Sequence, residues 1–123
     1  MRTSLGALLS VIAMVASSAC QTSPLRDVTL VARGMTFALA DRPDELNPVL
    51  RFRSGERVRL ILKNEAAGLS HDIAIPAWGV AVEPISSGHV ATTIFTVPQV
   101  SGQAEYRCRP HAAMMGGVVD VTR

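Results

Sequence analysis

Sulfur and nitrogen donors lie close together near the end of the chain. Cys108 is followed three residues later by His111, and Met114 and Met115 come directly after two alanines. A thiolate, an imidazole nitrogen and a thioether form a soft set of ligands, which suits copper. Zinc accepts cysteine and histidine but gains little from a thioether, and its structural sites usually use more cysteines. The segment therefore predicts one part of a copper site, and a further donor must come from elsewhere.

Three histidines limit the choice of that further donor. His71 follows the loop segment 64–70 and precedes an apolar stretch, so it enters a strand where its ring could reach the segment of Cys108. His89 lies beside Gly88 at an expected turn, where an exposed residue is the simpler interpretation. We therefore predict His71 as the second imidazole ligand.

The first residues differ in character from the remainder of the chain. Arg2 precedes an apolar run of twelve residues, 5–16, and small residues follow up to Cys20. This order is typical of a cleaved secretory signal, and the run is too short to span a membrane, which takes roughly 20 apolar residues. We predict a signal peptide over 1–19, a flexible tether over 20–27 and one folded domain over 28–123.

Cys20 stands where the lipobox of bacterial lipoproteins has the cysteine that is acylated and becomes the mature N-terminus. Ser17 occupies the position at which the lipobox prefers leucine, so cleavage near Ala19 without a lipid stays open. Either case predicts a periplasmic or otherwise extracytoplasmic protein, and the lipid would anchor it to the membrane. Because Cys20 lies at the processing site, Cys108 has no disulfide partner, and we expect its thiol to be buried, catalytic or bound to a metal.

Composition limits the class of the domain. The 123 residues are 48% hydrophobic and 18% charged, which suits a single globular domain. The formal net charge of +2 is too small for binding nucleic acid through phosphate neutralisation. Nucleic acid is therefore excluded as a partner.

Short alternating segments with turn residues between them predict an all-β protein, and no segment has a convincing helical period. Alternation places Val58, Leu60 and Leu62 on one face of their strand. We expect segment 41–48, with its two prolines, to be an unstructured connection. Together the segments predict a sandwich of two antiparallel sheets made from about eight strands: 28–33, 35–40, 49–52, 57–63, 72–75, 90–97, 104–108 and 118–122.

Alternation also fixes the expected direction of the cysteine. Ala104, Tyr106 and Cys108 share one face of the strand 104–108, and the polar residues between them share the other. We therefore expect the thiol of Cys108 to point inward at the end of this strand.

The order of these segments resembles the cupredoxins, the blue copper family of plastocyanin and amicyanin. The resemblance covers nearly all of the mature chain, and the residues that carry it form four segments: 54–58, 64–76, 101–108 and 117–121. It implies a Greek-key β-sandwich that holds one copper ion at one end. Individually the segments are weak signals, and their order makes the resemblance specific.

The resemblance also implies the ligand set. His71, Cys108 and His111 would be the equatorial ligands and Met115 the weak axial ligand, with Met114 as the alternative. The family's Met-x-Gly spacing, counted back from Gly117, selects Met115 and leaves Met114 at the surface. Asp72 stands where many members carry an asparagine whose backbone N–H donates to the cysteine sulfur. The backbone donor is kept in this chain, and the role of the carboxylate is left open.

The function that the resemblance implies is the transfer of single electrons between redox partners, such as a cytochrome, an oxidase or a reductase. We expect a monomer and no enzymatic activity, because the fold fixes every ligand and leaves no coordination position for a substrate. In the family the exposed edge of the C-terminal histidine, here His111, is the electron's exit through an apolar patch. The patch would consist of Pro110, Ala112, Ala113 and Met114, with 76–78 as a further part.

Several alternatives stay open. A periplasmic copper carrier could use the same donors at a more exchangeable site, and a sandwich without copper could keep the fold. A cysteine–histidine hydrolase would need an oxyanion hole, of which there is no signature, and a multicopper oxidase or nitrite reductase would need more than three histidines. Arg109 either belongs to a solvated surface or raises the copper potential and attracts an acidic partner.

Overall fold

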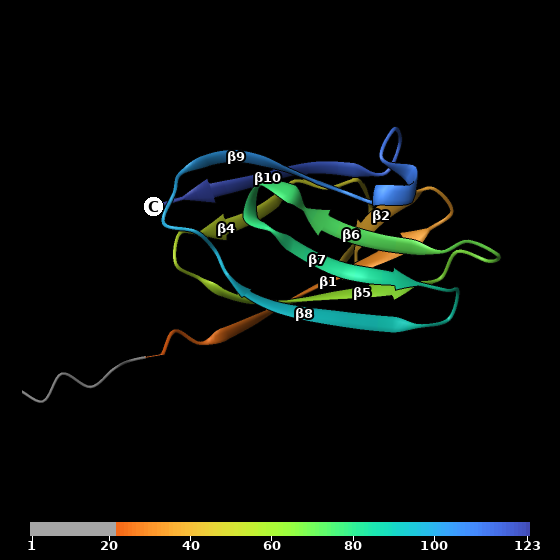
Figure 1. The fold of residues 1–123 in the computed structure, drawn as a ribbon, viewed down its shortest axis with the longest axis horizontal. Helices are drawn as coiled ribbons and strands as arrows, with labels where there is room; N and C mark the ends of the chain where they lie inside the picture. Colours follow the sequence, from red (N-terminus) through yellow and green to blue (C-terminus); the bar gives the residue numbers. More distant parts are fainter. Residues whose placement is uncertain (1–21) are drawn as a thin grey trace, which may run out of the picture.

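The computed structural model describes residues 22–123 and contains two five-stranded sheets that pack face to face (Figure 1). The strand order is β3-β2-β1-β5-β8 in the first sheet and β4-β10-β9-β6-β7 in the second. No helix among these residues is long and apolar enough to cross a membrane. The strands are β1 (Leu25–Arg33), β2 (Thr36–Leu39), β3 (Arg42–Leu46), β4 (Leu50–Arg53), β5 (Arg57–Asn64), β6 (His71–Ile75), β7 (Val80–Ile85), β8 (Val90–Thr96), β9 (Gly102–Arg107) and β10 (Gly116–Thr122).

Strand β5 shows how the sequence builds the core. Val58, Leu60 and Leu62 are fully buried, and the residues between them are partly exposed. β5 pairs with β1 on one side and β8 on the other, so its inward face lies at the centre of the first sheet. The predicted alternation is confirmed here. The buried apolar side chains of both sheets form one cluster between them.

The two sheets are mixed, so the prediction of antiparallel sheets was wrong. β1 runs parallel to β5, and β10 runs parallel to β4. Alternation of apolar and polar residues reports which face of a strand is buried but not which strands are neighbours. The parallel pairs arise because the chain crosses between the sheets after β3 and again after β4 and β5.

Two strands were not predicted. β3 lies in the segment expected to be unstructured, and all of its residues are exposed at the edge of the first sheet, where Pro43 is tolerated. β7, at the edge of the second sheet, was also missed. β1 begins at Leu25, three residues before the expected strand. The predicted signal peptide, 1–19, and Cys20 lie outside the described residues.

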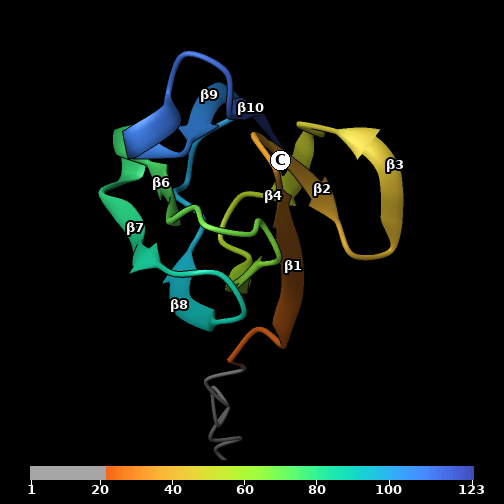
Figure 2. The same ribbon diagram turned by 90° about the vertical axis from the view of Figure 1, so that its right-hand side faces the viewer.

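The strands end together at two opposite ends of the sandwich. At the end that we call the site end, β5 finishes at Asn64, β6 begins at His71 and β9 finishes at Arg107. At the end that we call the N-terminal end, Leu25 of β1 lies opposite Arg57 of β5. Figure 2 looks onto the site end, where the short 3₁₀ helix η2 (Arg109–His111) lies beside β6 and β9.

Candidate metal centre

The three predicted equatorial ligands lie at the site end and come from two separate parts of the chain. His71 is the first residue of β6, Cys108 directly follows β9, and His111 is the last residue of η2. η2 is a single turn that starts with Arg109-Pro110, and proline suits its early position because no backbone N–H is needed there. The turn folds His111 back toward Cys108.

Hydrogen bonds close this turn into a compact loop. The backbone N–H of Cys108 donates to the carbonyl of Met115 at 2.9 Å, and the N–H of Met115 donates to the carbonyl of His111, also at 2.9 Å. The loop therefore returns to its starting point before β10 begins at Gly116. The loop must return in this way because β9 and β10 are antiparallel neighbours.

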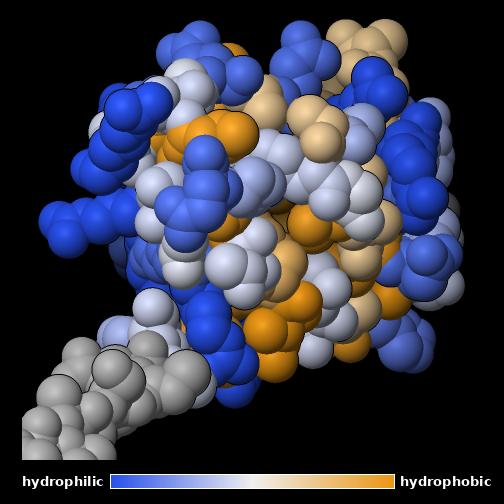
Figure 3. Space-filling view, turned by 60° about the vertical axis from the view of Figure 1, so that its left-hand side comes forward, coloured by the Kyte–Doolittle hydropathy of each residue, from blue (hydrophilic) through white to orange (hydrophobic). Residues whose placement is uncertain are grey.

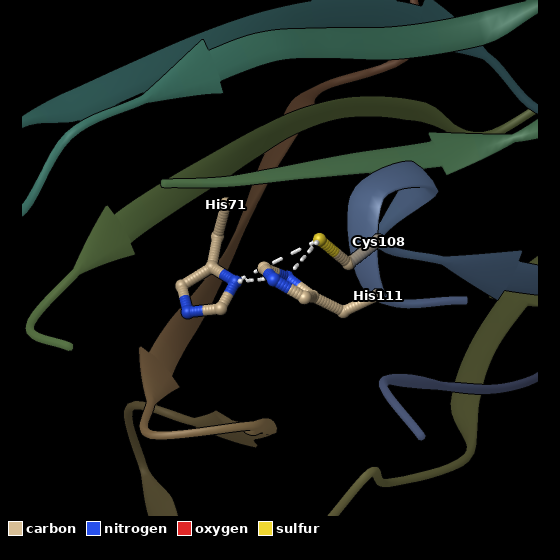
Figure 4. Close-up of side chains that lie close together, drawn as sticks. All are labelled: His71, Cys108 and His111. Carbon is tan, nitrogen blue, oxygen red and sulfur yellow. Dashed lines mark hydrogen bonds between the residues drawn. The ribbon is translucent and has the colours of Figure 1, made fainter. Parts of the chain in front are cut away.

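The donor atoms form a small triangle (Figure 4). The Nδ1 atoms of His71 and His111 are 3.2 Å apart, and the Sγ atom of Cys108 lies 3.7 Å from the first and 3.6 Å from the second. An ion about 2.0 Å from each nitrogen and about 2.3 Å from the sulfur would hold coplanar donors about 3.5 to 3.7 Å apart. The triangle fits a metal ion at its centre.

The two candidate axial methionines differ in burial. Met115 is fully buried and belongs to the apolar core, whereas 58% of Met114 is exposed. A thioether ligand must face the inside of the loop, and a side chain that is more than half exposed is poorly placed for that. The burial therefore favours Met115, in agreement with the sequence.

Comparison with solved structures places this arrangement in a known fold. The chain is similar to a multicopper oxidase from Aquifex aeolicus (TM-score 0.65, 14% identity, 81% of this chain and 28% of that chain). It is also similar to auracyanin A, a blue copper protein from Chloroflexus aurantiacus (TM-score 0.59, 15% identity, 80% of this chain and 100% of that chain). The match to reduced rusticyanin has a TM-score of 0.56 and 21% identity, over 83% of this chain and 82% of that chain.

The chain has the cupredoxin fold. The likeness rests on structure alone, because no protein-family model and no curated protein matches the sequence. The chain spans only 28% of the multicopper oxidase, and the same share of a copper-containing nitrite reductase from Thermus scotoductus. It covers most or all of the small copper proteins.

Within this cupredoxin fold, the carboxylate of Asp72 ties the two ligand segments together. Its Oδ1 atom accepts a hydrogen bond from the backbone N–H of Arg109 at 2.7 Å, and its Oδ2 atom pairs with Nε of Arg109 at 2.5 Å. Only 1% of the Asp72 side chain is exposed. Because Asp72 follows His71 and Arg109 follows Cys108, these contacts fix one ligand segment against the other. This is the role that the sequence left open.

The same contacts change the interpretation of Arg109. Its guanidinium is paired with Asp72, and the carboxylate of Glu83 lies 3.8 Å from its Nη2 atom. These carboxylates raise the pKa of Arg109, with the hydrogen bond to Asp72 as the main cause. Arg109 is therefore not a free cation. The nearby carboxylates balance part of its charge, and its effect on the copper potential and on an acidic partner stays a prediction.

On the other side of the loop, Asn47 and Tyr106 hold the segment before β10. Asn47 has a positive φ of 46°, accepts a hydrogen bond from the backbone N–H of Phe37 and donates from Nδ2 to the carbonyl of Met114 at 3.3 Å. The hydroxyl of Tyr106 donates to the carbonyl of Pro48 at 2.7 Å. The sequence did not indicate this role of Asn47, because a polar residue next to Pro48 is only a turn signal.

Gly117 explains why the chain needs a glycine beside this contact. A Cβ atom at this position would lie 2.8 Å from the hydroxyl of Tyr106 and 2.9 Å from the carbonyl of Asn47. No real side chain tolerates both distances. β10 can therefore pass close to the β3–β4 connection only because residue 117 has no side chain.

The pKa values of the buried donors are shifted against ionisation in the metal-free protein. Burial lowers the pKa of His71 from 6.5, and the charge of His111 lowers it further. Burial raises the pKa of Cys108 from 9.0, although hydrogen bonds from the backbones of Asp72 and His111 oppose this rise. The site thus holds a neutral imidazole and a thiol, and a bound cation would favour the thiolate over the thiol.

The far nitrogen of His71 is buried. Its Nε2 atom has no hydrogen-bond partner within residues 22–123. The backbone of Gly34, in the β1–β2 turn, lies near the ring and raises the pKa of His71, against the larger effect of burial. A ligating histidine commonly offers its second N–H to such a backbone carbonyl. The turn at Gly34 is therefore part of the surroundings of the site, which the sequence did not indicate.

His111 is the partly exposed member of the triangle. Four exposed residues of its loop surround it, in agreement with the sequence: Pro110, Ala112, Ala113 and Met114. The expected contribution from 76–78 was wrong. These residues form the short helix η1 (Pro76–Trp78) at the end of β6 away from His71, where the ring of Trp78 packs 6.2 Å from Phe52 and 5.9 Å from Phe95. His89 is exposed at a turn, as predicted.

Proposed function

We propose that the protein is a mononuclear type 1 copper protein that carries one electron at a time between redox protein partners. The triangle of two imidazole nitrogens and one cysteine sulfur, within 3.7 Å of one another at the site end of a cupredoxin fold, is the observation that carries this proposal. Copper is the metal that a thiolate, two imidazoles and a thioether suit best. His71, Cys108 and His111 would hold it, with Met115 as the weak fourth ligand.

The chain's own residues make such a site suitable for electron transfer. Copper, when bound, supplies a one-electron redox couple. The donor set is a compromise between the preferences of Cu(I) and Cu(II), so a change of charge requires little movement of the ligands. The hydrogen bonds of Asp72 to the loop oppose movement of the two ligand segments. The partly exposed ring of His111, among small apolar side chains, offers a short route to a docked partner.

We further propose where the protein acts. The order of residues 1–19 supports export to the periplasm, and Cys20 supports attachment to the membrane through a lipid. A cytochrome, an oxidase or a reductase would be the redox partner, and we expect the protein to act as a monomer. Mass spectrometry of the mature N-terminus tests the anchor: an acylated Cys20 supports it, and an unmodified N-terminus contradicts it.

Addition of Cu(II) to the purified mature protein tests the copper site. We expect one copper per chain and an intense blue colour, because a thiolate bound to Cu(II) absorbs visible light by charge transfer. Cys108→Ser should abolish the colour. His89→Gln is the matched control, because His89 is exposed and lies outside the cluster. A colourless complex, or colour that survives in Cys108→Ser, would contradict the proposal.

The fourth ligand has its own test. Met115→Leu removes the thioether but keeps a buried apolar side chain of similar size. If Met115 is the axial ligand, its loss removes electron density that favours Cu(II), so the reduction potential should rise in a redox titration. Met114→Leu should leave the potential unchanged. The reverse result would assign the axial position to Met114.

A copper carrier is the second candidate, and the partial exposure of His111 favours it. A carrier needs a ligand that an acceptor can displace, and His111 is the one that solvent reaches. The rate at which a copper chelator removes the metal separates the two functions. Slow removal together with fast electron exchange with a soluble cytochrome supports electron transfer. Fast removal together with slow electron exchange would support the carrier.

A further inference from the structure

The N-terminal end of the sandwich lies opposite the metal centre and collects several strand ends. Leu25 of β1 lies opposite Arg57 of β5, which in turn lies opposite Thr96 of β8. In the second sheet, Arg53 of β4 lies opposite Thr122 of β10. In Figure 1 the segment before β1 and the C-terminus lie on this side, away from η2. β5 has 8 residues, so the two ends are about 25 Å apart.

This end carries more arginines than acidic residues. Three of its arginines are neutralised in ion pairs: Arg26–Glu56 at 3.0 Å, Arg51–Asp120 at 3.1 Å and Arg59–Asp27 at 3.4 Å. Three others have no ion-pair partner within residues 22–123: Arg53, Arg57 and Arg123. Asp41, which lies beside Arg26 and Asp27 and has no ion pair in the described residues, offsets one of these charges. The N-terminal end therefore keeps a net positive charge.

The surroundings of the metal centre differ. Arg33 is paired with Glu65 and Arg109 with Asp72. Glu83 and Glu105 are exposed at that half of the second sheet and offset the free cations Lys63 and Arg107. The excess of positive charge is thus a property of one end rather than of the whole surface. Figure 3 shows strongly hydrophilic side chains on this side, next to the point where the chain enters β1.

The position of Cys20 indicates that a membrane could lie against the N-terminal end. Cys20 precedes Leu25 by five residues, which span at most about 18 Å. A lipid on Cys20 would therefore hold the N-terminal end, and not the site end, next to the headgroups of the membrane. Guanidinium groups bind phosphate oxygens through paired hydrogen bonds, and each basic residue near an anionic membrane contributes about 1 kcal/mol. The positive charge and the expected lipid attachment therefore both place the N-terminal end at the membrane.

We propose that Arg53, Arg57 and Arg123 form a surface that docks on anionic phospholipid headgroups. Docking would turn the triangle of His71, Cys108 and His111 away from the membrane and toward a partner. The orientation rests on the proposed lipid anchor, but the binding of phospholipid by the arginines requires neither the lipid nor copper. Its failure can therefore be distinguished from failure of the proposed electron transfer.

Vesicle flotation of the exported chain with Cys20→Ser tests the surface without a lipid. The probes are vesicles of phosphatidylcholine alone and of phosphatidylcholine and phosphatidylglycerol in equal parts. We expect binding to the acidic vesicles alone, and a decrease of about 30-fold in affinity for the double variant Arg53→Gln/Arg123→Gln, the equivalent of about 2 kcal/mol. The matched control is Lys63→Gln/Arg107→Gln, which also removes two exposed cations without ion-pair partners in the described chain, but at the site end.

Each outcome decides the proposal. A large loss in the first double variant and little change in the control supports the surface. Equal losses in both variants would show a general effect of net charge and overturn it, as would equal binding to both kinds of vesicle. Circular dichroism and blue colour after addition of copper identify a variant that fails to fold. Mass spectrometry of the wild-type N-terminus separately decides the anchor and hence the orientation.

Discussion

The two ends of the sandwich use polar residues in opposite ways. At the site end, the polar side chains of Asp72, Asn64 and Tyr106 are buried and bonded to other parts of the chain. At the N-terminal end, Arg53 and Arg123 are exposed and have no acidic partner in the described part. Buried polar groups act through geometry, because an unmade bond is costly, whereas exposed charges act over distance and are screened by salt. Substitutions at the two ends should therefore separate stability from association.

Asp72→Ala should have the largest effect on stability. It removes both contacts with Arg109 and leaves the backbone N–H of Arg109 without its acceptor. We expect the free energy of unfolding of the metal-free protein to fall by about 2 to 3 kcal/mol in urea titrations, since a buried hydrogen-bonding group loses its partner. Asp72→Asn is the control, because its amide oxygen can still accept from this N–H. Equal losses in the two variants would show that the charge, not the hydrogen bond, holds the loop.

Tyr106→Phe should have a smaller effect at the same end. The substitution removes the hydrogen bond to the carbonyl of Pro48 but keeps the ring, which packs 5.9 Å from Phe37. We expect a loss of about 1 kcal/mol in the same urea titration. The visible spectrum of the copper form should also change slightly if this bond positions the loop. A variant as stable as the wild type would show that solvent replaces the hydroxyl at Pro48.

The pH dependence of the metal-free protein should be gradual and should report the site end alone. The pKa of His71 is lowered in the folded state, so the unfolded state takes up the proton first and stability should fall as the pH drops below 6.5. The pKa of Cys108 is raised, so the unfolded state releases the proton first and stability should fall as the pH rises above 9.0.

Maximum stability is thus expected between these two values, and urea titrations across the pH range measure it. Cys108→Ala is the control, because it should remove the part of the decrease that begins near pH 9 and leave the acidic side unchanged. A decrease at higher pH should remain, since burial also raises the pKa of Tyr106 above 10.0. A wild-type curve that stays flat above pH 9 would contradict the assignment to the buried thiol.

The sequence predicted the all-β sandwich and the residues that meet at its site end, but not every strand or the contacts between the ligand segments. His71, Cys108 and His111 could be found because soft donors at short spacing have few other uses, and the structure brings them together. The clamp between Asp72 and Arg109 could not be predicted, because it joins residues 37 positions apart through one carboxylate. Strand β3 was missed because its residues are all exposed, so it has no apolar alternation. Edge strands of this kind are specified by their neighbours rather than by their own sequence.

The smallest effect on stability is expected at the N-terminal end. Arg53→Gln removes an exposed side chain without an ion-pair partner among residues 22–123, so the free energy of unfolding should change by less than about 0.5 kcal/mol. The same substitution should weaken binding to acidic vesicles about fivefold at low salt and much less at high salt, because salt screens exposed charges. A loss of stability comparable to that of Tyr106→Phe would mean that Arg53 has a structural role. An unchanged salt dependence of vesicle binding would mean that the charge of Arg53 does not face the membrane. The two ends would then differ only in how deeply their polar side chains are buried.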